Sequence, residues 1–476
     1  MGVRFVLNGK AVTVASAGVD SHVTLLQWLR AQGLCGTKEG CAEGECGACA
    51  VALVSSEPTE RGSHFEPVNS CLLPLAAVDG RELVTVEGVA SPAGDLHPVQ
   101  AALVAAGGSQ CGYCTPGFVV SLFCEYYRPG RAGFDPESIS GNLCRCTGYR
   151  PIADVARALP CPAAGDARLV QLGKRAPGLS ASESGTPSAR FFRPVTLARA
   201  FDLFEAHPNA LPIAGGTDLM VEANQRYRRW PALVSLEALS ELQVLTLGPT
   251  EVVLGAAVPL ARIEHALAAA GGSAGSGLLA QLLPLFSSRL IRNRATLGGN
   301  LATASPIGDA APALLALGAE VELVSRRGTR RLPLADFFTG YRRTALEPGE
   351  LILALHVARP LPEFQRFYKV SKRVLDDIST VAAAFALSLD EGGNVTRFGV
   401  GFGGVAETPL GAPSLEQLAL GRAWDQTTLA LLVAEAAALG TPQTDLRGSA
   451  GYRRAMLHKL IEKFFHESQR QAEAAE

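Results

Sequence analysis

The sequence predicts an α+β protein built from several domains. At 476 residues the chain is about three domains long. All eleven cysteines lie within residues 1–161, so the N-terminal third carries a chemistry that the remainder lacks. From residue 191 onward, strand-like segments such as 251–258 alternate with helix-like segments such as 197–206, which is typical of a mixed fold.

Composition and charge exclude two classes of protein. The formal net charge of -2 lacks the clustered basic excess of a nucleic-acid-binding surface. Apolar runs are interrupted by Gly, Pro or charge well before the ~20 residues that a membrane span needs. Residues 1–14 alternate apolar and polar side chains around Asn8-Gly9, which predicts a β-hairpin and not a signal peptide. We therefore expect a cytoplasmic protein that binds neither nucleic acid nor membrane, with reduced thiols.

The first cysteine motif has the spacing of a plant-type [2Fe–2S] ferredoxin. Cys41-x4-Cys46-x2-Cys49, with Cys71 further on, fits that spacing. Glycines at 40, 44 and 47 suit a loop whose N–H groups point inward at a cluster, since some of its residues need positive φ. Structural zinc is the alternative, but zinc sites prefer C-x2-C pairs and only one is present in this motif.

Flanking segments predict a small β-grasp unit around this loop. The N-terminal hairpin is followed by a helix that carries Leu25, Leu26 and Leu29. Asp20 is expected to cap this helix and Gly33 to end it. Cys35 fits no ligand spacing, so we expect it to be a buried apolar residue.

The second cysteine motif consists of two close pairs, Cys111-x2-Cys114 and Cys144-x-Cys146. Each pair precedes a predicted helix start, with Thr115 as the expected N-cap of the first helix. Two helix N-termini would stabilise one anionic cluster. No histidine lies near either pair, which argues against a Rieske-type site. Taken alone, this motif also fits zinc or a redox dithiol.

Two glycine-centred segments are candidates for binding a dinucleotide. No G-x-G-x-x-G follows a strand, so a Rossmann fingerprint is absent. Residues 211–220 instead contain Gly215-Gly216, and residues 291–309 contain Gly298-Gly299. Backbone amides without side chains can approach a pyrophosphate closely, although most such pairs are simply turns.

The cysteine segments resemble one known family. CAEGECGAC at 41–49, QCGYCTPGF at 110–118 and GNLCRCTGYRPI at 141–152 resemble the iron–sulfur part of the molybdenum hydroxylases, the family of xanthine dehydrogenase and aldehyde oxidase. The resemblance implies two [2Fe–2S] clusters, with the second nearer a molybdenum cofactor. Their implied ligands are Cys41, Cys46, Cys49 and Cys71 for the first cluster, and Cys111, Cys114, Cys144 and Cys146 for the second.

The resemblance also implies a domain order. We expect a β-grasp ferredoxin-like domain, a helical-bundle [2Fe–2S] domain, a linker rich in Ala, Gly, Ser and Pro, an α+β FAD-binding domain of PCMH/VAO-like type, and a C-terminal α+β flavoprotein-associated domain. The expected boundaries are 1–85, 86–160, 161–190, 191–364 and 365–476.

Flavin contacts follow from the same resemblance. Two segments would line the pyrophosphate: Pro212, Ile213, Ala214, Gly215, Gly216, Thr217, Asp218 and Leu219 in the first, and Thr296, Leu297, Gly298, Gly299 and Asn300 in the second. Asp309 would hold a polar part of the dinucleotide, Phe286 would pack on its adenine side, and Ile352 and Lys369 would contact the rest. Tyr341 would lie near the isoalloxazine face where nicotinamide arrives. Alternatively, Phe286 and Ile352 are core residues and Lys369 is a solvated charge.

Finally, the resemblance implies an electron-transfer role. The family's molybdopterin-binding portion is several hundred residues long, so this chain resembles the small subunit of a two-subunit, bacterial-type xanthine dehydrogenase. A large partner subunit would bind molybdopterin and the purine, in a dimer of heterodimers, and this chain would contain no catalytic residue. Electrons would pass through two clusters and FAD to NAD⁺ as hypoxanthine and xanthine are oxidised to urate.

Three other functions stay open. The chain could serve a related hydroxylase of aldehydes or N-heterocycles. It could be a stand-alone flavin–ferredoxin reductase, or, more remotely, a zinc scaffold without enzymatic activity.

Overall fold

The chain folds into two compact units. The computed structural model describes residues 2–15, 19–55, 62–91, 93–173, 178–272 and 277–473. Residues 1–240 and 288–295 form the first unit, and residues 241–287 and 296–476 form the second. The region expected to be the FAD-binding domain, 191–364, is therefore divided between the two units.

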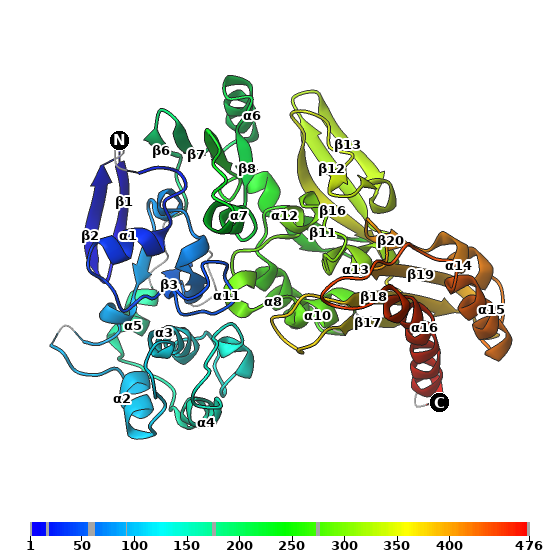
Figure 1. Cartoon of the computed structure of the whole chain (residues 1–476), viewed down its shortest axis with the longest axis horizontal. Helices are drawn as coiled ribbons and strands as arrows, with labels where there is room; N and C mark the ends of the chain where they lie inside the picture. The colour runs from blue at the N-terminus through cyan, green and yellow to red at the C-terminus, as the bar shows by residue number, and fades with distance from the viewer. Residues whose placement is uncertain are drawn as a thin grey trace. The chain divides into compact units, whose positions relative to one another are not determined.

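The first unit begins with a five-stranded sheet of order β2-β1-β5-β3-β4 (Figure 1). Its strands are β1 (Gly2–Leu7), β2 (Lys10–Ala15), β3 (Ala50–Val54), β4 (Phe65–Asn69) and β5 (Glu82–Val84). The predicted hairpin β1–β2 is confirmed, because Asn8 and Gly9 take the positive φ values, 52° and 78°, of a type I′ turn. β1 is parallel to β5, and helix α1 (Leu25–Ala31) packs Leu25 and Leu29 into the same core as β1, which completes the β-grasp unit.

The cap of α1 differs from the prediction. Thr24, and not Asp20, caps the helix: its hydroxyl accepts a hydrogen bond from the Gln27 N–H at 3.2 Å, and the Gln27 side chain accepts one from the Thr24 N–H at 3.0 Å. Asp20 is too far upstream to reach the first turn and instead accepts from the His22 N–H. Gly33, with φ of +83°, follows the helix end as predicted.

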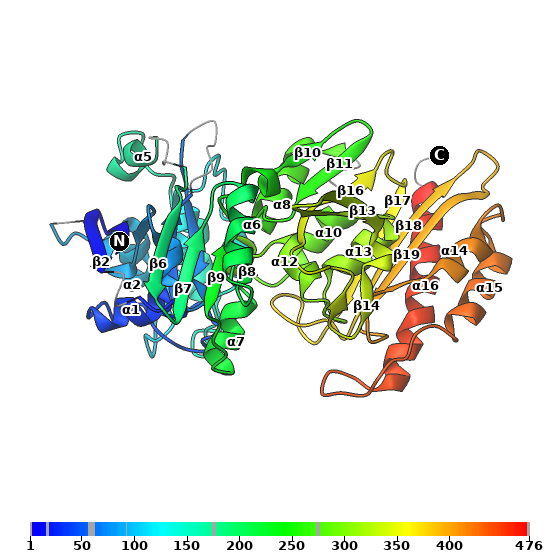
Figure 2. The same ribbon diagram turned by 90° about the horizontal axis from the view of Figure 1, so that it is seen from above.

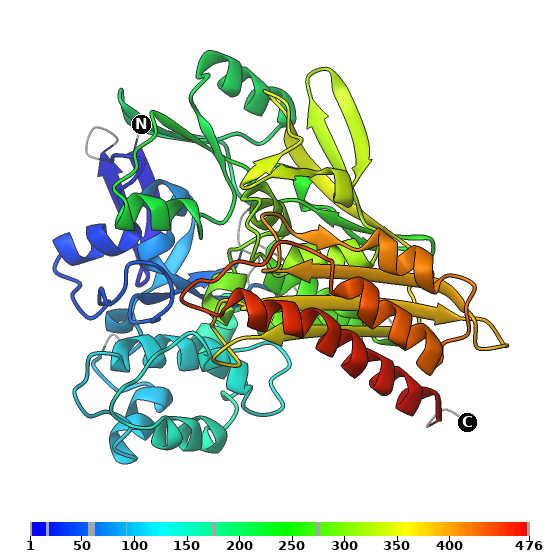
Figure 3. The same ribbon diagram turned by 45° about the vertical axis from the view of Figure 1, so that its right-hand side comes forward.

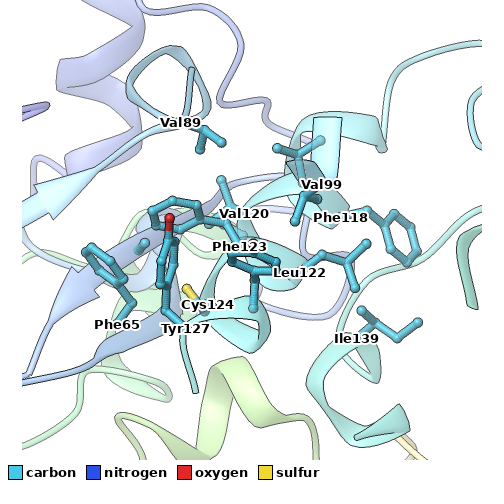
Figure 4. Packing of buried hydrophobic residues seen from close by; sticks show 14 of the residues in the cluster. Phe65, Val89, Val99, Phe118, Val120, Leu122, Phe123, Cys124, Tyr127 and Ile139 are labelled. Carbon is cyan, nitrogen blue, oxygen red and sulfur yellow. The ribbon is translucent and has the colours of Figure 1, made fainter. Parts of the chain in front are cut away.

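Helices make up the next part of the first unit. They are α2 (Pro98–Ala105), α3 (Thr115–Tyr126), α4 (Arg150–Ala158) and α5 (Ala167–Leu172). α3 is buried along most of its length and lies at the centre of this part, where Phe118, Phe123 and Cys124 are buried (Figure 4). Phe65 of β4 packs against Phe123 with 4.8 Å between ring centroids, so the helices share a core with the first sheet.

A second sheet completes the first unit. Its order is β6-β7-β9-β8, and β7, β9 and β8 are parallel (Figure 2). The strands are β6 (Ser182–Thr186), β7 (Ala189–Arg193), β8 (Leu211–Ile213) and β9 (Ala232–Ser235). Three further helices belong to this unit: α6 (Leu197–Ala206), which packs on β9, α7 (Leu219–Gln225), and α11 (Arg289–Arg292), which packs on β4 of the first sheet.

Residues 161–190, which we expected to be a linker, contain regular structure. α5 and β6 both fall in this range, whereas residues 174–177 lie outside the described ranges. Leu169 and Leu172 pack into the core around α3. Two leucines one helical turn apart are enough to attach a short helix, although the surrounding composition is that of a linker.

The second unit contains an antiparallel sheet of order β10-β11-β16-β12-β13. The strands are β10 (Leu245–Leu247), β11 (Glu251–Gly255), β12 (Glu320–Ser325), β13 (Gly328–Pro333) and β16 (Leu351–Ala358), with a separate ribbon of β14 (Phe338–Gly340) and β15 (Arg343–Thr344). The accompanying helices are α8 (Leu260–Ala270), α10 (Leu278–Leu282), α12 (Leu297–Ala302) and α13 (Ala310–Ala316).

A four-stranded antiparallel sheet forms the C-terminal part of the second unit. Its elements are β17 (Phe364–Val370), β18 (Val381–Leu389), β19 (Val395–Gly403), β20 (Leu410–Gly411), α14 (Pro413–Ala419), α15 (Gln426–Ala436) and α16 (Ala450–Glu473). The last three helices gather on one face (Figure 3). On β19, Gly399 and Gly401 share a face with the α13 backbone, where an added Cβ would lie 1.9 Å from the Ala316 oxygen and 2.1 Å from the Pro312 oxygen.

The predicted fold class is confirmed. The chain is a multidomain α+β protein with a β-grasp unit, a helical unit, a mixed α+β region and a C-terminal α+β region. Among the helices that the structure describes, none combines the length and the hydropathy needed to cross a bilayer.

Candidate cofactor sites

The first cysteine loop has a backbone that only small residues allow. Gly44 and Gly47 have φ values of +88° and +64°, and Ala42 is also left-handed at +56°. At Gly40, a Cβ would lie 2.8 Å from the Cys46 sulfur. Glycine suits positions 44 and 47 because their φ angles are positive, and position 40 because the Cys46 sulfur lies so close.

The three cysteines of this loop and Cys71, which follows β4, form two thiol pairs. Cys49 and Cys71 are 3.3 Å apart at their sulfurs, and both are buried. The thiols of Cys41 and Cys46 are hydrogen-bonded to each other, and this bond is the main cause that lowers the pKa of Cys41 to about 5. It also raises the pKa of Cys46. Backbone N–H groups of residues 43, 45 and 46 further stabilise the Cys41 thiolate.

This arrangement fits a binuclear cluster. Within the described ranges, no group of three or more His, Cys, Asp and Glu side chains is arranged to hold one metal ion. A [2Fe–2S] cluster makes a different demand, namely four thiolates shared by two iron atoms, with N–H groups directed at sulfur. Two thiol pairs in a glycine-rich loop supply those groups.

The second set of cysteines also pairs, and each pair joins the two halves of the motif. The thiol of Cys111 is hydrogen-bonded to that of Cys146, and Cys114 to Cys144. Burial is the main cause that raises the pKa of Cys114 to about 12. Burial also pushes the pKa of Cys144 upward, but hydrogen bonds from Thr147 and neighbouring groups outweigh it and leave the pKa lowered.

The helix start beside this set is displaced by one residue from the prediction. Cys114 is the N-cap of α3, and Thr115 occupies the first helical position, where its hydroxyl bonds to Ser109. The N-terminus of α3 therefore begins at a candidate ligand. α4 starts later, at Arg150, after Tyr149 with φ of +65°.

The two cysteine loops contact each other directly. The Leu143 N–H donates to the Cys46 carbonyl oxygen at 3.0 Å, and the Asn142 side chain donates to the Gly47 oxygen at 3.2 Å. A Cβ at Gly47 would lie 2.2 Å from the Gly141 oxygen. Leu143 directly precedes Cys144 of the second set, so its hydrogen bond connects that set to Cys46 of the first set. Sequence reasoning missed Asn142, because its partner is 95 residues away.

A buried ion network fixes the first cysteine domain to the second sheet. Glu237, just after β9, pairs with Arg81 at 2.6 Å and with Arg294 at 2.9 Å. Arg193, which is fully buried, lies 3.9 Å from the same carboxylate. Burial alone would raise the pKa of Glu237, but the three guanidinium groups lower it to about 2.

The first glycine-rich segment lies at the carboxyl end of β8. Gly215 packs against the chain, because an added Cβ would be 1.9 Å from the Arg294 oxygen. Gly216 has φ of +79°, and its Cβ would lie 3.0 Å from the oxygen of Leu72, the neighbour of Cys71. Asp218 precedes α7. The protein's own backbone therefore accounts for both glycines, and the segment adjoins the first cysteine loop.

The second glycine-rich segment belongs to the other unit. The Thr296 hydroxyl accepts from the Gly299 N–H at 3.0 Å and begins α12. Gly298 is tightly packed, with a Cβ position 2.6 Å from the Ala256 oxygen. Gly299 is exposed, and only the Thr296 hydroxyl lies close to its Cβ position, at 3.1 Å. The Asn300 Oδ1 is buried without a hydrogen-bond partner among the described residues. An exposed glycine beside an unsatisfied acceptor fits a polar ligand that can donate a hydrogen bond, such as a dinucleotide.

Other predicted flavin contacts fall in the second unit as well. Lys369 pairs with Asp309 at 3.0 Å and donates to the oxygen of Leu285 at 2.8 Å, next to Phe286. Asp309 also accepts from the Ser379 hydroxyl at 2.5 Å, so the structure joins Lys369 and Asp309 in one buried ion pair. Lys369 is not a solvated charge.

The three remaining candidates differ in exposure. Ile352 is buried in β16, Phe286 is half-buried, and Tyr341 is 60% exposed in the turn between β14 and β15.

Cys35, expected to be buried, is exposed, because it follows the end of α1 on the surface. Cys124 is buried in α3.

Family models match the chain in four successive ranges. A 2Fe-2S iron-sulfur cluster binding domain matches 5–76, and a [2Fe-2S] binding domain matches 85–157. The FAD binding domain in molybdopterin dehydrogenase matches 187–360, and the CO dehydrogenase flavoprotein C-terminal domain matches 366–468. The chain therefore contains two [2Fe–2S] domains and an FAD-binding domain.

Solved structures show the same relationship. CO dehydrogenase from Oligotropha carboxidovorans is similar over 57% of this chain and 94% of that chain, with a TM-score of 0.52 and 31% identity. The chain belongs to the molybdenum hydroxylase family. Quinoline 2-oxidoreductase from Pseudomonas putida 86 is also similar, over 59% of this chain and 96% of that chain, with a TM-score of 0.53 and 25% identity.

Curated relatives of this molybdenum hydroxylase chain include xanthine dehydrogenases. The Emericella nidulans enzyme is 33% identical over 99% of this chain and 39% of its own length. The xanthine dehydrogenase/oxidase of Rattus norvegicus is 31% identical over 89% of this chain and 36% of its own length. The chain thus spans less than two fifths of these relatives.

Proposed function

We propose that this chain is the electron-transfer subunit of a bacterial-type, NAD⁺-dependent xanthine dehydrogenase located in the cytoplasm. A large partner subunit would bind molybdopterin and oxidise hypoxanthine and xanthine to urate, in a dimer of heterodimers. The two clusters and FAD supply the redox chemistry when bound. The role of this chain is to hold them in order and at short separation.

The observation that carries the proposal is the contact between the two cysteine loops. The Leu143 N–H bonds to the Cys46 oxygen, while Leu143 is covalently joined to Cys144. The two proposed ligand sets are thereby connected through backbone atoms. On the other side of the first set, Leu72 adjoins Gly216 of the proposed flavin segment. These two contacts support a relay in the order of second cluster, first cluster and flavin.

An exposed apolar rim supports a partner at the second cysteine set. Cys111 and Cys146 are exposed, and Tyr113, Leu143 and Tyr149 are exposed beside them in sequence. Aromatic and aliphatic side chains around a redox centre suit a docking surface, because burial of such side chains stabilises an interface. A stand-alone reductase would not need this rim.

A hydroxylase of another N-heterocycle is the second candidate. Its support is the similarity to quinoline 2-oxidoreductase over most of that chain. The xanthine dehydrogenases match this chain more completely, from the first cysteine domain through the C-terminal region, at 33% identity over 99% of its length. We therefore favour the purine substrate.

Coexpression tests the proposal. The chain is produced with and without the molybdopterin-binding chain of its source, and urate formation from xanthine with NAD⁺ is followed, together with oxidation of quinoline and benzaldehyde. We expect urate only from the pair, and NADH-dependent reduction of a dye by either preparation. Urate from this chain alone would overturn the subunit assignment, and activity confined to quinoline or benzaldehyde would overturn the purine assignment.

A matched pair of variants tests the docking surface. Leu143→Asp places a charge on the exposed rim, whereas Val170→Asp places one on exposed α5. We expect only Leu143→Asp to weaken copurification of the large chain, by at least tenfold, with iron content unchanged. Equal copurification of both variants would place the partner elsewhere.

A further inference from the structure

Side-chain amides from α7 bind the backbone of the first cysteine loop. Asn224 Nδ2 donates to the oxygen of Ala42 at 2.9 Å and to that of Cys71 at 2.8 Å. Gln225 Nε2 donates to the Cys41 oxygen at 2.6 Å. The amide orientation is determined by these partners, since carbonyl oxygens accept and only the NH2 group can donate to them.

The Asn224 contact bridges the two thiol pairs. Ala42 follows Cys41, which pairs with Cys46, whereas Cys71 pairs with Cys49. Both hydrogens of one NH2 group are therefore used to tie together segments that are 29 positions apart. Ala42 also holds a left-handed φ of +56°, which is unfavourable for alanine, so a donor on its carbonyl helps to retain the loop conformation.

The same helix begins at the first glycine-rich segment. α7 spans Leu219–Gln225, directly after Gly215 and Gly216, and its last two residues contact the cysteine loop. One short helix thus connects the proposed pyrophosphate segment to the proposed ligands of the first cluster. Leu72 approaches Gly216 from the cluster side, which gives a second contact between the same two segments.

We propose that Asn224 and Gln225 are positioning residues that set the geometry and the reduction potential of the first [2Fe–2S] cluster. The inference rests on the proposed ligand set of Cys41, Cys46, Cys49 and Cys71. Three N–H bonds direct the positive ends of amide dipoles at the cysteine loop, and a reduced cluster carries one more negative charge than an oxidised one. Removing these donors therefore destabilises the reduced state and lowers the potential.

The substitutions form a graded series. Asn224→Leu removes both donors at similar volume. Asn224→Asp removes them and adds a negative charge that faces two carbonyl oxygens. Gln225→Leu removes one donor at an exposed position, where the fold tolerates change. We expect the potential of the first cluster to fall most for Asn224→Asp, less for Asn224→Leu and least for Gln225→Leu.

Two controls separate this effect from general damage. The second cluster is an internal control in every variant, because Asn224 and Gln225 bind backbone of the first cysteine set. Glu222→Gln alters the same helix at a side chain that pairs with the exposed Arg226 and Arg228 and not with the cysteine loop residues bound by Asn224 and Gln225. The second cluster should keep its reduction potential in every variant, and Glu222→Gln should leave the reduction potential of the first cluster unchanged.

The experiment uses the full chain and follows both electron paramagnetic resonance signals during a redox titration, with iron content measured in parallel. A lowered potential and altered g values in one signal, with full iron and an unmoved second signal, support the proposal. Unmoved signals in iron-replete Asn224→Leu overturn it. If the Asn224 variants do not assemble, Gln225→Leu decides by the same criterion. A wild-type chain without two [2Fe–2S] signals would instead overturn the proposed function.

Discussion

The two cysteine sites differ in how the protein encloses them. In the first, Cys49 and Cys71 are buried, and amides from α7 bind the loop from outside its own domain. In the second, Cys111 and Cys146 are exposed, and the exposed side chain of Tyr113 adjoins them. The first site is enclosed by the chain itself, whereas the second presents two of its four proposed ligands, Cys111 and Cys146, on the surface.

This difference matches the demands of a relay. A carrier in the middle of a chain needs rigid positioning toward both neighbours, which buried hydrogen bonds supply. A carrier at the end must come close to a group on another subunit, so its surroundings stay open until that subunit docks. The following predictions test this contrast, from the largest expected effect to the smallest.

The largest effect is expected when one proposed ligand is removed from each site. Cys46→Ser should abolish one [2Fe–2S] signal and Cys146→Ser the other, each with half of the iron lost, because four thiolates are needed per cluster. Electron paramagnetic resonance and iron analysis provide the measurements. If either variant loses both signals while remaining folded, the two sites are not independent and the contrast fails.

Next in size is the loss of the ion network that fixes the first site. Glu237→Gln leaves Arg81 and Arg294 buried beside a neutral amide, which should lower the free energy of unfolding by about 3–5 kcal/mol at pH 7. The pKa of Glu237 is lowered from 4.5 to about 2 in the folded chain. Its stabilisation is therefore present above about pH 4.5 and lost as the pH falls toward 2.

Urea unfolding at several pH values measures this effect. The wild-type chain should lose stability steeply between pH 4.5 and 2, and the variant should show a flatter dependence over that window. A substitution in an exposed ion pair, Asp154→Asn beside Arg157, serves as the control and should change stability by less than about 1 kcal/mol. Equal effects of Asp154→Asn and Glu237→Gln would show that the network does not fix the first site.

A pair of glycines sharpens the comparison further. Gly47→Ala places a Cβ 2.2 Å from the Gly141 oxygen at a φ of +64°, and should cost at least about 3 kcal/mol. Gly112→Ala has a similar φ of +81°, but its Cβ meets nothing closer than 3.9 Å, and should cost about 1 kcal/mol. Thermal unfolding of both variants gives the difference. Equal costs would mean that the two loops do not press together at Gly47.

The smallest effect concerns the proposed flavin segment, where Gly299 is exposed and its neighbour Gly298 is packed against Ala256. Gly299→Leu adds a side chain at an exposed position and should reduce FAD affinity at least tenfold, or about 1.4 kcal/mol, with the fold intact. Ala302→Leu adds similar bulk at another exposed position of α12 and should leave affinity unchanged. Flavin fluorescence titration measures both. Full FAD content in folded Gly299→Leu would move the pyrophosphate site elsewhere.

Much of the local structure followed from short-range patterns. The Asn8-Gly9 hairpin, the glycines of the cysteine loop and the helix after Cys114 were predictable, because turn chemistry and ligand spacing act within a few residues. Errors of one or a few residues occurred at caps. Thr24 replaced Asp20 since only a side chain at the first turn can reach its N–H groups.

What the sequence alone determined is therefore the set of local motifs: two cysteine groups in order, two glycine-rich segments and an α+β pattern. The tertiary structure decided how the motifs are joined. Asn224 contacts Cys71 across 153 positions, and Arg81 contacts Glu237 across 156. Amides and buried ion pairs carry no periodic signature, and they become recognisable only when folding brings distant carbonyl and carboxylate oxygens within hydrogen-bonding distance.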